Sequence, residues 1–515
     1  MTSLKLDSVT YQDYSESVKI DQNAISENEK QLLEVELSKI FESVINLHKK
    51  IWDDSSCVFR RTELKSERKQ KNQIGILTDF HNDAGIDEKT PQKTLHWQGV
   101  VGRIKWTEID NDIDLSIDIR TPFEKEGKYY FMAYLLMNAF GGSSNTAPFG
   151  ASVTYDDLFH FLYIYLFKDK LKKAYSAGPY KKYETFERND DRVRGHIDVA
   201  RHIKLNMGLA NGKIAYSYRE RTADNSINRL ILHTFEMLRQ LYPKMVSSLL
   251  DSDSDFDAIL RSIEFGCPSW RSENVRTAAS RSVMPITQPL YQDYEDLRKL
   301  CLRILSGEGI SVFGEDSDET ISNTILFYVP DIWEMYLEKL IQRAIDDINS
   351  GNGVPQLKLD SQAEVKIIGG IANRRPDFVV YGKDENGEDA PYAVIDAKFK
   401  KHYDEVQEGK VFSSYPDDLT QCLSYSAILN CNRIGIIFPY SNEIDENGKE
   451  IVNTFKPYKH YISNYNKDSY FGFIGLCVPT IKDDDTFDSW KAKIKDSEDT
   501  LTKKIKGLLI DDFKK

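Results

Sequence analysis

The chain has 515 residues, which is too long for one hydrophobic core, so two to four domains are expected. Hydrophobic residues make up 40% and aromatic residues 11% of the chain, a composition that excludes an intrinsically disordered protein. The 68 Lys and Arg against 81 Asp and Glu give a net charge of −13, which disfavours strong, autonomous binding to nucleic acid.

Signals for a membrane, for secretion or for disulfides are missing from the sequence. No run of about 18 apolar residues occurs, and Met1 is followed by a polar segment of mixed charge. A cytoplasmic protein without membrane contact is therefore expected. The six cysteines form no C-x-x-C pair and no zinc-like spacing with histidine, so we predict reduced, mostly buried thiols.

Residues 1–150 are predicted to form a β-rich N-terminal domain. A polar arm comes first, and apolar residues at spacings of three and four then predict a helix over residues 29–52. Alternating patterns predict strands over 95–106 and 113–121, and the apolar run 129–142 is taken as a further strand-like segment.

Residues 151–320 are predicted to form a mainly helical middle region. Helical periodicity covers residues 155–175, 225–245 and 289–305, and Pro243 and Gly307 are expected to end the last two helices. The stretch between the first two helices reads as two short strands followed by a capped helix.

Two local basic runs, at residues 60–71 and 168–183, stand out against the acidic chain. They fit solvated surfaces better than a binding site, although both interpretations stay open.

The final region, residues 321–515, has the element order helix, three strands, helix, strand. The first helix covers residues 329–348, with Asp331 as its predicted cap and Trp333 in its apolar stripe. Strands are predicted over 363–369, 376–382, 391–399 and 433–439, with a helix over 417–430. The connection through that helix is a βαβ crossover, which requires its two strands to be parallel.

Two acidic residues fall on strands that are otherwise apolar. Alternation puts Val394, Asp396 and Lys398 on one face of their strand, with the apolar neighbours on the other face. Asp377 follows Pro376 at the start of the preceding strand, and neighbouring strands lie about 4.8 Å apart. Both carboxylates can therefore reach one divalent cation with oxygen ligands. The alternative is an Asp–Lys ion pair and an aspartate in a turn.

A carboxylate pair with a nearby lysine suits the hydrolysis of a phosphodiester. Carboxylates hold Mg²⁺, or Mn²⁺ as a substitute, and the cation neutralises the phosphoryl oxygens and stabilises the leaving alkoxide. Lys398 can orient the attacking water or stabilise the pentavalent phosphate.

Further site residues are expected on the two flanking helices. Glu334 fits a metal ligand, but it also fits a capping box with Asp331, and both interpretations stay open. Asp418, Gln421 and Tyr425 share one side of the next helix and can face the same cleft, or they can form an ordinary polar stripe.

The segments RRPDFVV, AVIDAKFK and DLTQCLSYS resemble the PD-(D/E)xK nuclease superfamily and follow its αβββαβ order. Together with WEMYLEKL upstream, they look most like the McrC subunit of McrBC-type, modification-dependent (type IV) restriction systems and the related LlaJI-type restriction proteins. VRGHIDVARHI and the helix that contains NSINRL resemble the family's G-x-I/L-D segment and N-R-x-x-K/H helix.

This resemblance implies an α+β multidomain protein with a restriction-endonuclease-like domain at residues 321–515. It implies that Asp377, Asp396 and Lys398 are catalytic, with Glu334 as the acid from the helix and Gln421 in support. Asp377, Asp396 and Glu334 would bind Mg²⁺. It also implies DNA as substrate and a hexameric, McrB-like AAA+ GTPase as partner, which docks on the N-terminal domain and whose GTP hydrolysis the subunit stimulates.

The absence of a G-x-x-x-x-G-K-[ST] loop excludes the chain itself as the motor. Two alternatives to a partner-dependent nuclease stay open: an adaptor that activates the motor without cutting, and a stand-alone repair nuclease. The acidic net charge disfavours the second.

Overall fold

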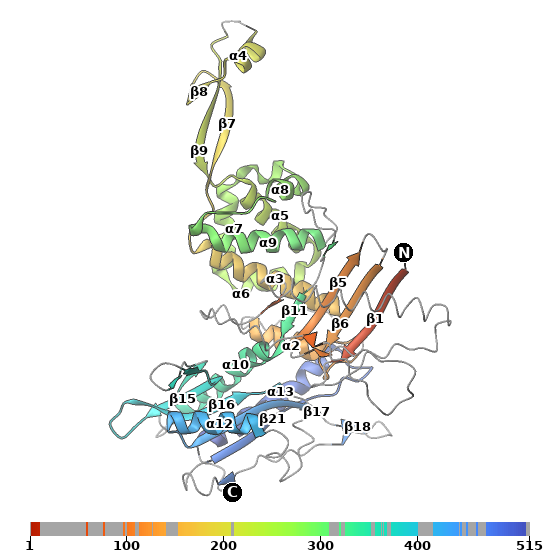
Figure 1. Cartoon of the computed structure of the whole chain (residues 1–515), viewed down its shortest axis with the longest axis vertical. Coiled ribbons are helices and arrows are strands. Elements are labelled where there is room, and N and C mark those ends of the chain that lie inside the picture. Colours follow the sequence, from red (N-terminus) through yellow and green to blue (C-terminus); the bar gives the residue numbers. More distant parts are fainter. Residues whose placement is uncertain are drawn as a thin grey trace.

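The computed structural model describes part of the chain. The described residues are 2–10, 58–59, 76–77, 96–97, 100–108, 113–125, 127–140, 153–207, 211–307, 319–320, 325–351, 356–361, 363, 365–367, 372–399, 416–441, 443–444, 450–451, 460–461 and 470–510. The helix predicted over residues 29–52 and the basic run 60–71 lie outside them. Within them, the chain is an α+β protein with two six-stranded sheets and a helical body (Figure 1).

The first sheet combines strands from distant parts of the chain. Its order is β1-β6-β5-β11-β2, and β10 pairs with the last two residues of β5, Thr107 and Glu108. Strands β5 and β6 are antiparallel, as expected for the alternating segments. Strand β11, which follows the helical body in the sequence, also pairs with β5. The strands are β1 (Thr2–Thr10), β2 (Val58–Phe59), β5 (Val100–Glu108), β6 (Ile113–Arg120), β10 (Glu319–Thr320) and β11 (Ile325–Tyr328). Strands β3 (Ile76–Leu77) and β4 (His96–Trp97) form a separate pair.

The strand-like segment predicted over 129–142 is wrong, because Tyr130–Phe140 forms helix α2. Its side chains from Tyr130 to Leu136 are all buried, and a helix covered on every side shows no amphipathic period. A short apolar run of this kind does not distinguish a buried strand from a buried helix. Helix α2 packs against the first and last helices of the C-terminal region, so packing crosses the predicted boundary at residue 150, and the three-domain division stays a prediction.

The helical body agrees closely with the prediction. Helix α3 (Tyr155–Tyr175) begins with a capping box from Thr154, helix α5 (Ser226–Leu241) ends before Pro243, and helix α9 (Gln292–Gly307) ends at Gly307. Three shorter helices complete the body: α6 (Pro243–Ser252), α7 (Ser254–Gly266) and α8 (Val275–Arg281). In the second basic run, Lys168 and Lys172 pair with Asp253, which fits a structural role for those two lysines.

A two-stranded arm projects from the helical body (Figure 1). Strands β7 (Lys182–Asp190) and β9 (Ile214–Thr222) are antiparallel, and β8 (His196–Ile197) and helix α4 (Val199–Asn206) lie at the tip. Gly195 has a φ of +69°, and a Cβ there would lie 2.6 Å from the Ser217 carbonyl oxygen, so the turn into β8 requires glycine. Strand β8, strand β9 and the capped helix α5 match the prediction, whereas β7 and α4 were not predicted.

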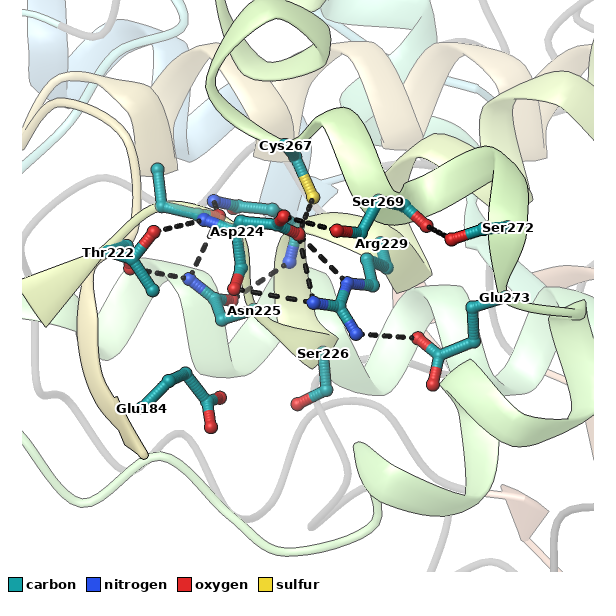
Figure 2. Close-up of polar contacts among 12 residues, drawn as sticks. Glu184, Thr222, Asp224, Asn225, Ser226, Arg229, Cys267, Ser269, Ser272 and Glu273 are labelled. Atoms are coloured by element: carbon teal, nitrogen blue, oxygen red, sulfur yellow. Dashed lines mark hydrogen bonds and ion pairs between the residues drawn. The ribbon is translucent and has the colours of Figure 1, made fainter. Parts of the chain in front are cut away.

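The root of the arm is fixed by a buried polar network (Figure 2). The Asn228 amide donates to the carbonyls of Tyr180, shortly before β7, and Ala223, directly after β9. Arg229 pairs with Asp224 at 2.9 Å and with Glu273 at 3.1 Å. These contacts hold both strands of the arm against helix α5.

The second sheet lies in the C-terminal region, in the order β12-β15-β16-β17-β21-β20. Strand β16 pairs antiparallel with β15 and parallel with β17, so the predicted parallel crossover is confirmed. The strands are β12 (Lys358–Ser361), β15 (Phe378–Lys383), β16 (Asp389–Ala397), β17 (Arg433–Ser441), β20 (His460–Tyr461) and β21 (Tyr470–Val478). Outside this sheet, β18 (Glu443–Ile444) pairs with β19 (Glu450–Ile451).

Helices cover both faces of this sheet. Helices α10 (Val329–Asn349) and α13 (Phe487–Ile510) pack on the face that carries Ile395, Ala397 and Phe399. Helix α12 (Pro416–Leu429) covers the opposite face, where Tyr425 packs against Val394. The predicted division of this strand into an apolar face and a face with charged residues is confirmed.

Two predictions in this region need correction. The strand predicted over 363–369 is present as β13 (Val365–Ile367), but it forms a separate hairpin with β14 (Ala372–Arg374), and β12 is the edge strand of the sheet instead. Asp331 does not cap α10, because the helix begins at Val329 with Pro330 in its first turn.

Among the described helices, none combines the length and the apolar character needed to span a bilayer. The five described cysteines are free thiols, four of them buried, as predicted.

Candidate functional site

Strand β16 delivers a buried carboxylate and an ammonium to the side of the sheet beneath α12. Asp396 lies near the end of β16 and is 1% exposed, and Lys398 follows two residues later, so pleating puts both on one face. Lys398 Nζ lies 2.8 Å from Asp396 Oδ2. The backbone N–H of Lys398 donates to the Ile437 carbonyl on β17, which extends the parallel pairing past the end of β16.

Asp377 reaches the same place from the neighbouring strand. It directly precedes β15, whose first residue pairs with Ile395, so Asp377 lies beside the end of β16. Asp377 Oδ2 accepts a hydrogen bond of 2.7 Å from the backbone N–H of Ala397. The structure therefore brings Asp377, Asp396 and Lys398 together as the sequence pattern predicts.

Helix α12 closes the site over Lys398. Gln421 Oε1 accepts from Lys398 Nζ at 3.2 Å, and the Gln421 amide donates to the Tyr425 hydroxyl at 2.9 Å. Tyr425 in turn donates to the Arg375 carbonyl at 3.4 Å, next to the start of β15. Asp418 Oδ1 lies 3.7 Å from Lys398 Nζ. These side chains of α12 therefore gather around Lys398 and do not form an exposed polar stripe.

The carboxylates in this site resist ionisation. Burial, and then the charges of Asp396 and Glu334, raise the pKa of Asp377 well above its usual value. Burial also raises the pKa of Asp396, against the opposing effect of Lys398. Burial would lower the pKa of Lys398, but the surrounding carboxylates, with Asp396 the strongest, raise it above its usual range. Two carboxyl groups, from Asp377 and Asp396, thus lie close to a single amine, that of Lys398.

Glu334 lies on α10, near enough for its charge to act on Asp377. Because α10 begins at Val329, a capping box between Asp331 and Glu334 does not form. Among the described residues, no group of three or more His, Cys, Asp or Glu side chains is placed to hold a metal ion. Glu334 is therefore a neighbour of the carboxylate pair in this structure, and its role as a third ligand stays a prediction.

The chemistry of the pair fits Mg²⁺. Asp396 Oδ2 is buried and receives no hydrogen bond in the described part of the chain, so its contact with Lys398 is an ion pair rather than a directed hydrogen bond. A buried oxygen that already attracts one positive charge has the chemistry of a cation ligand. Mg²⁺ usually binds through one or two carboxylates and keeps its remaining sites for water and substrate phosphate. Asp377 and Asp396 would supply those carboxylates.

The sequence pattern did not reveal the backbone contacts that orient the site. The N–H of Ala397 and the carbonyl of Arg375 are main-chain groups. Every residue type has this carbonyl, and every type except proline has this N–H, so residue identity does not predict the contacts. Only the strand register brings them to Asp377 and Tyr425.

Comparison with known proteins gives a family. A family model described as McrBC 5-methylcytosine restriction system component matches residues 95–439, about two thirds of the chain. No curated protein matches the chain. The chain is similar to one in a half-complex from a tetradecameric assembly of Thermococcus gammatolerans McrB AAA+ hexamers with bound McrC. The identity is 15%, the TM-score is 0.43, and the match covers 97% of this chain and 100% of that one.

A second solved structure, the Thermococcus gammatolerans McrBC complex, matches at 15% identity with a TM-score of 0.27 and covers 67% of this chain and 88% of that one. The family match confirms the resemblance to McrBC-type restriction systems. The chain belongs to the McrBC 5-methylcytosine restriction system component family.

Proposed function

We propose that this chain is a Mg²⁺-dependent DNA endonuclease subunit of a McrBC-like restriction system. The observation that carries the proposal is that Asp377, just before β15, lies beside the end of β16, where Asp396 is, with Lys398 2.8 Å from Asp396. The order α10, β12, β15, β16, α12, β17 supports a PD-(D/E)xK fold for this region, with the β13–β14 hairpin inserted before β15.

The residues around the pair would divide the work of phosphodiester hydrolysis. Mg²⁺ bound by Asp377 and Asp396 would neutralise charge on the phosphoryl oxygens and the leaving alkoxide. The Ala397 N–H fixes the Asp377 carboxylate through its Oδ2. Lys398 carries a positive charge and three donors, so it can orient the attacking water or stabilise the charge that builds on the phosphate. Gln421 and Tyr425 hold the lysine in place from α12.

We also propose that the subunit acts with an AAA+ GTPase partner of the McrB kind, whose GTP hydrolysis it stimulates. The family description and the acidic chain support a nuclease that a partner brings to DNA. The residues of the N-terminal region that were expected to dock on this partner lie mostly outside the described part of the chain.

The arm supports a second contact with that partner. Val199, Ile203 and Met207 are 63%, 61% and 82% exposed. Their spacing of four places Val199 and Ile203 on one side of α4, and Met207 directly follows the helix. Nine-residue strands carry this side about 30 Å from the helical body. Exposed apolar side chains gathered at the end of a long ribbon are typical of an interaction surface, and the AAA+ partner is the occupant we propose.

Cleavage of plasmid DNA tests the nuclease proposal. Methylated and unmethylated plasmid are incubated with the full chain and Mg²⁺, with and without the AAA+ partner. We expect cleavage only with the partner and Mg²⁺, and none with Asp396→Asn, which keeps the shape of the side chain. Cutting by the chain alone would favour the stand-alone repair nuclease, and stimulation of GTP hydrolysis without any cutting would favour the adaptor.

A substitution at the arm tip tests the partner contact separately. Ile203→Asp puts a charge on the apolar side of α4 and is expected to reduce GTPase stimulation, whereas Thr185→Asp, at an exposed position on β7, is the matched control. Equal stimulation by both variants would exclude α4 as the contact.

A further inference from the structure

Asp418 is a buried acid in a place where an exposed one would serve the helix equally well. Asp417 and Asp418 both lie in the first turn of α12, where a negative charge interacts favourably with the helix dipole. Asp417 is exposed, but Asp418 is only 8% exposed. Burying a carboxylate is costly unless it is paired, and the ammonium of Lys398 is a positive charge within reach of Asp418.

The ammonium of Lys398, which Asp418 faces, already pairs with Asp396. Lys398 Nζ lies 2.8 Å from Asp396 Oδ2 and 3.7 Å from Asp418 Oδ1. Gln421 Oε1 lies 3.2 Å from the same nitrogen. One ammonium is thus shared between two carboxylates and one amide oxygen, and it sits closest to Asp396.

This arrangement conflicts with a cation on Asp396. Oδ2 of Asp396 is the buried oxygen without a hydrogen-bond donor, and it is also the atom nearest to the ammonium. A divalent cation and an ammonium at the same oxygen repel each other, and the repulsion is strong in a buried site. The ammonium therefore has to move when a cation binds there.

Asp418 is the second carboxylate with which the Lys398 ammonium can pair after a short movement. The difference between the two ion-pair distances is 3.7 − 2.8 = 0.9 Å, so a shift of about that size, which a lysine side chain makes by rotamer adjustment, turns the longer contact into a direct ion pair. Gln421 can keep its hydrogen bond through the shift because it lies on the same helix one turn further on.

We propose that Asp418 is a positioning residue that receives the Lys398 ammonium when a divalent cation takes the Asp396 carboxylate. The inference rests on the proposed function and deepens it. It gives a role to a buried acid beside Lys398 that is not one of the proposed ligands. It also gives Lys398 a fixed place from which to face the scissile phosphate, because the amine stays paired instead of being left loose.

Metal affinity in a set of variants tests the proposal. The affinity of the full chain for Mn²⁺ is measured by electron paramagnetic resonance for the wild type, Asp418→Asn, Asp418→Glu and the matched control Asp417→Asn. Loss of residues that support metal ligands typically weakens metal affinity about 10–100-fold. We expect a loss of at least about tenfold for Asp418→Asn, recovery with Asp418→Glu, and no change for Asp417→Asn.

The Lys398→Met background shows whether Asp418 acts through the lysine. Without the competing ammonium, Asp418→Asn is expected to cost little further affinity, so the two substitutions are strongly non-additive. An equal loss in both backgrounds would mean that Asp418 is a direct ligand or a general source of charge, and it would overturn the proposal. So would wild-type affinity in Asp418→Asn.

Failure of the proposed function has a different signature. If Asp396→Asn binds Mn²⁺ as well as the wild type does, the metal site itself is misassigned and the role of Asp418 fails with it. If Asp396→Asn abolishes binding and Asp418→Asn does not weaken it, the metal site stands and only this inference is overturned. Unfolding temperatures of all variants, measured alongside, identify any that fold poorly.

Discussion

Replacing Lys398 with methionine removes the ammonium from the site and keeps most of the apolar length of the side chain. The exposed fractions of the Lys398 and Asp396 side chains are 17% and 1%, and their charged atoms lie 2.8 Å apart. Loss of one partner from a buried ion pair leaves an uncompensated charge, which typically costs about 3–5 kcal/mol. We expect the free energy of unfolding of the C-terminal region to fall by about that amount.

Urea unfolding followed by tryptophan fluorescence measures this loss. Trp333 and Trp490 are fully buried in the core of the same region, so their emission reports its unfolding. Lys358→Met is the matched control, because Lys358 pairs with Asp389 at 2.7 Å on the surface, with exposed fractions of 63% and 42%. A surface pair contributes at most about 1 kcal/mol.

Adding Mg²⁺ provides a second test of this prediction. Mg²⁺ supplies positive charge next to Asp396, so it should stabilise Lys398→Met more than the wild type, and the gain should grow with its concentration. Equal urea midpoints for Lys398→Met and Lys358→Met, with no response to Mg²⁺, would refute the reasoning, because the carboxylate would then not be buried beside the lysine.

Three further substitutions test other parts of the structure. Trp333→Ala removes a fully buried ring that packs against Phe399, and it should cost about 3–5 kcal/mol in urea unfolding; a loss below about 1 kcal/mol would show that the ring is not buried. Burial raises the pKa of Glu498 above its usual 4.5, so the wild type loses stability as the pH rises from about 4.5 through the folded-state pKa. Glu498→Gln resembles the protonated acid, so its unfolding temperature should rise relative to that of the wild type between pH 4 and pH 8. A difference between the two unfolding temperatures that does not change with pH would contradict the pKa shift. Asn228→Ala removes one hydrogen bond from each of two carbonyls at the arm root, those of Tyr180 and Ala223, which both keep a donor in the Asn225 amide. Each lost hydrogen bond is worth about 0.5–1.5 kcal/mol, so amide hydrogen exchange should speed up in β7 and β9 but not in α3; unchanged exchange would mean that the Asn228 contacts do not anchor the arm.

Sequence patterns were most informative where one physical requirement dominated. The apolar stripe with Trp333 identified helix α10, and capping and breaking residues such as Pro243 and Gly307 located the ends of the helices in the body. Strand alternation placed Asp396 and Lys398 on the same face, and the crossover fixed the pairing of β16 with β17. These features depend on local spacing, which a single sequence contains.

Other features depend on contacts between distant segments. Helix α2 was taken for a strand because burial on all sides removed its periodicity, and the edge strand β12 was missed because its four residues carry too little signal. The arm went unrecognised because its tip is apolar and exposed, a combination that burial rules do not predict. Asp418 could be placed on the correct side of α12, but its burial and its distance to Lys398 required the structure.

A crystal structure of the full chain soaked in Mn²⁺ tests the central claim most directly, because anomalous scattering locates this ion without reference to the protein coordinates. We expect a peak within about 2.3 Å of carboxylate oxygens from both Asp377 and Asp396, with Lys398 moved toward Asp418. A peak that touches neither aspartate, or both aspartates turned away from each other with the ion bound elsewhere, would contradict it.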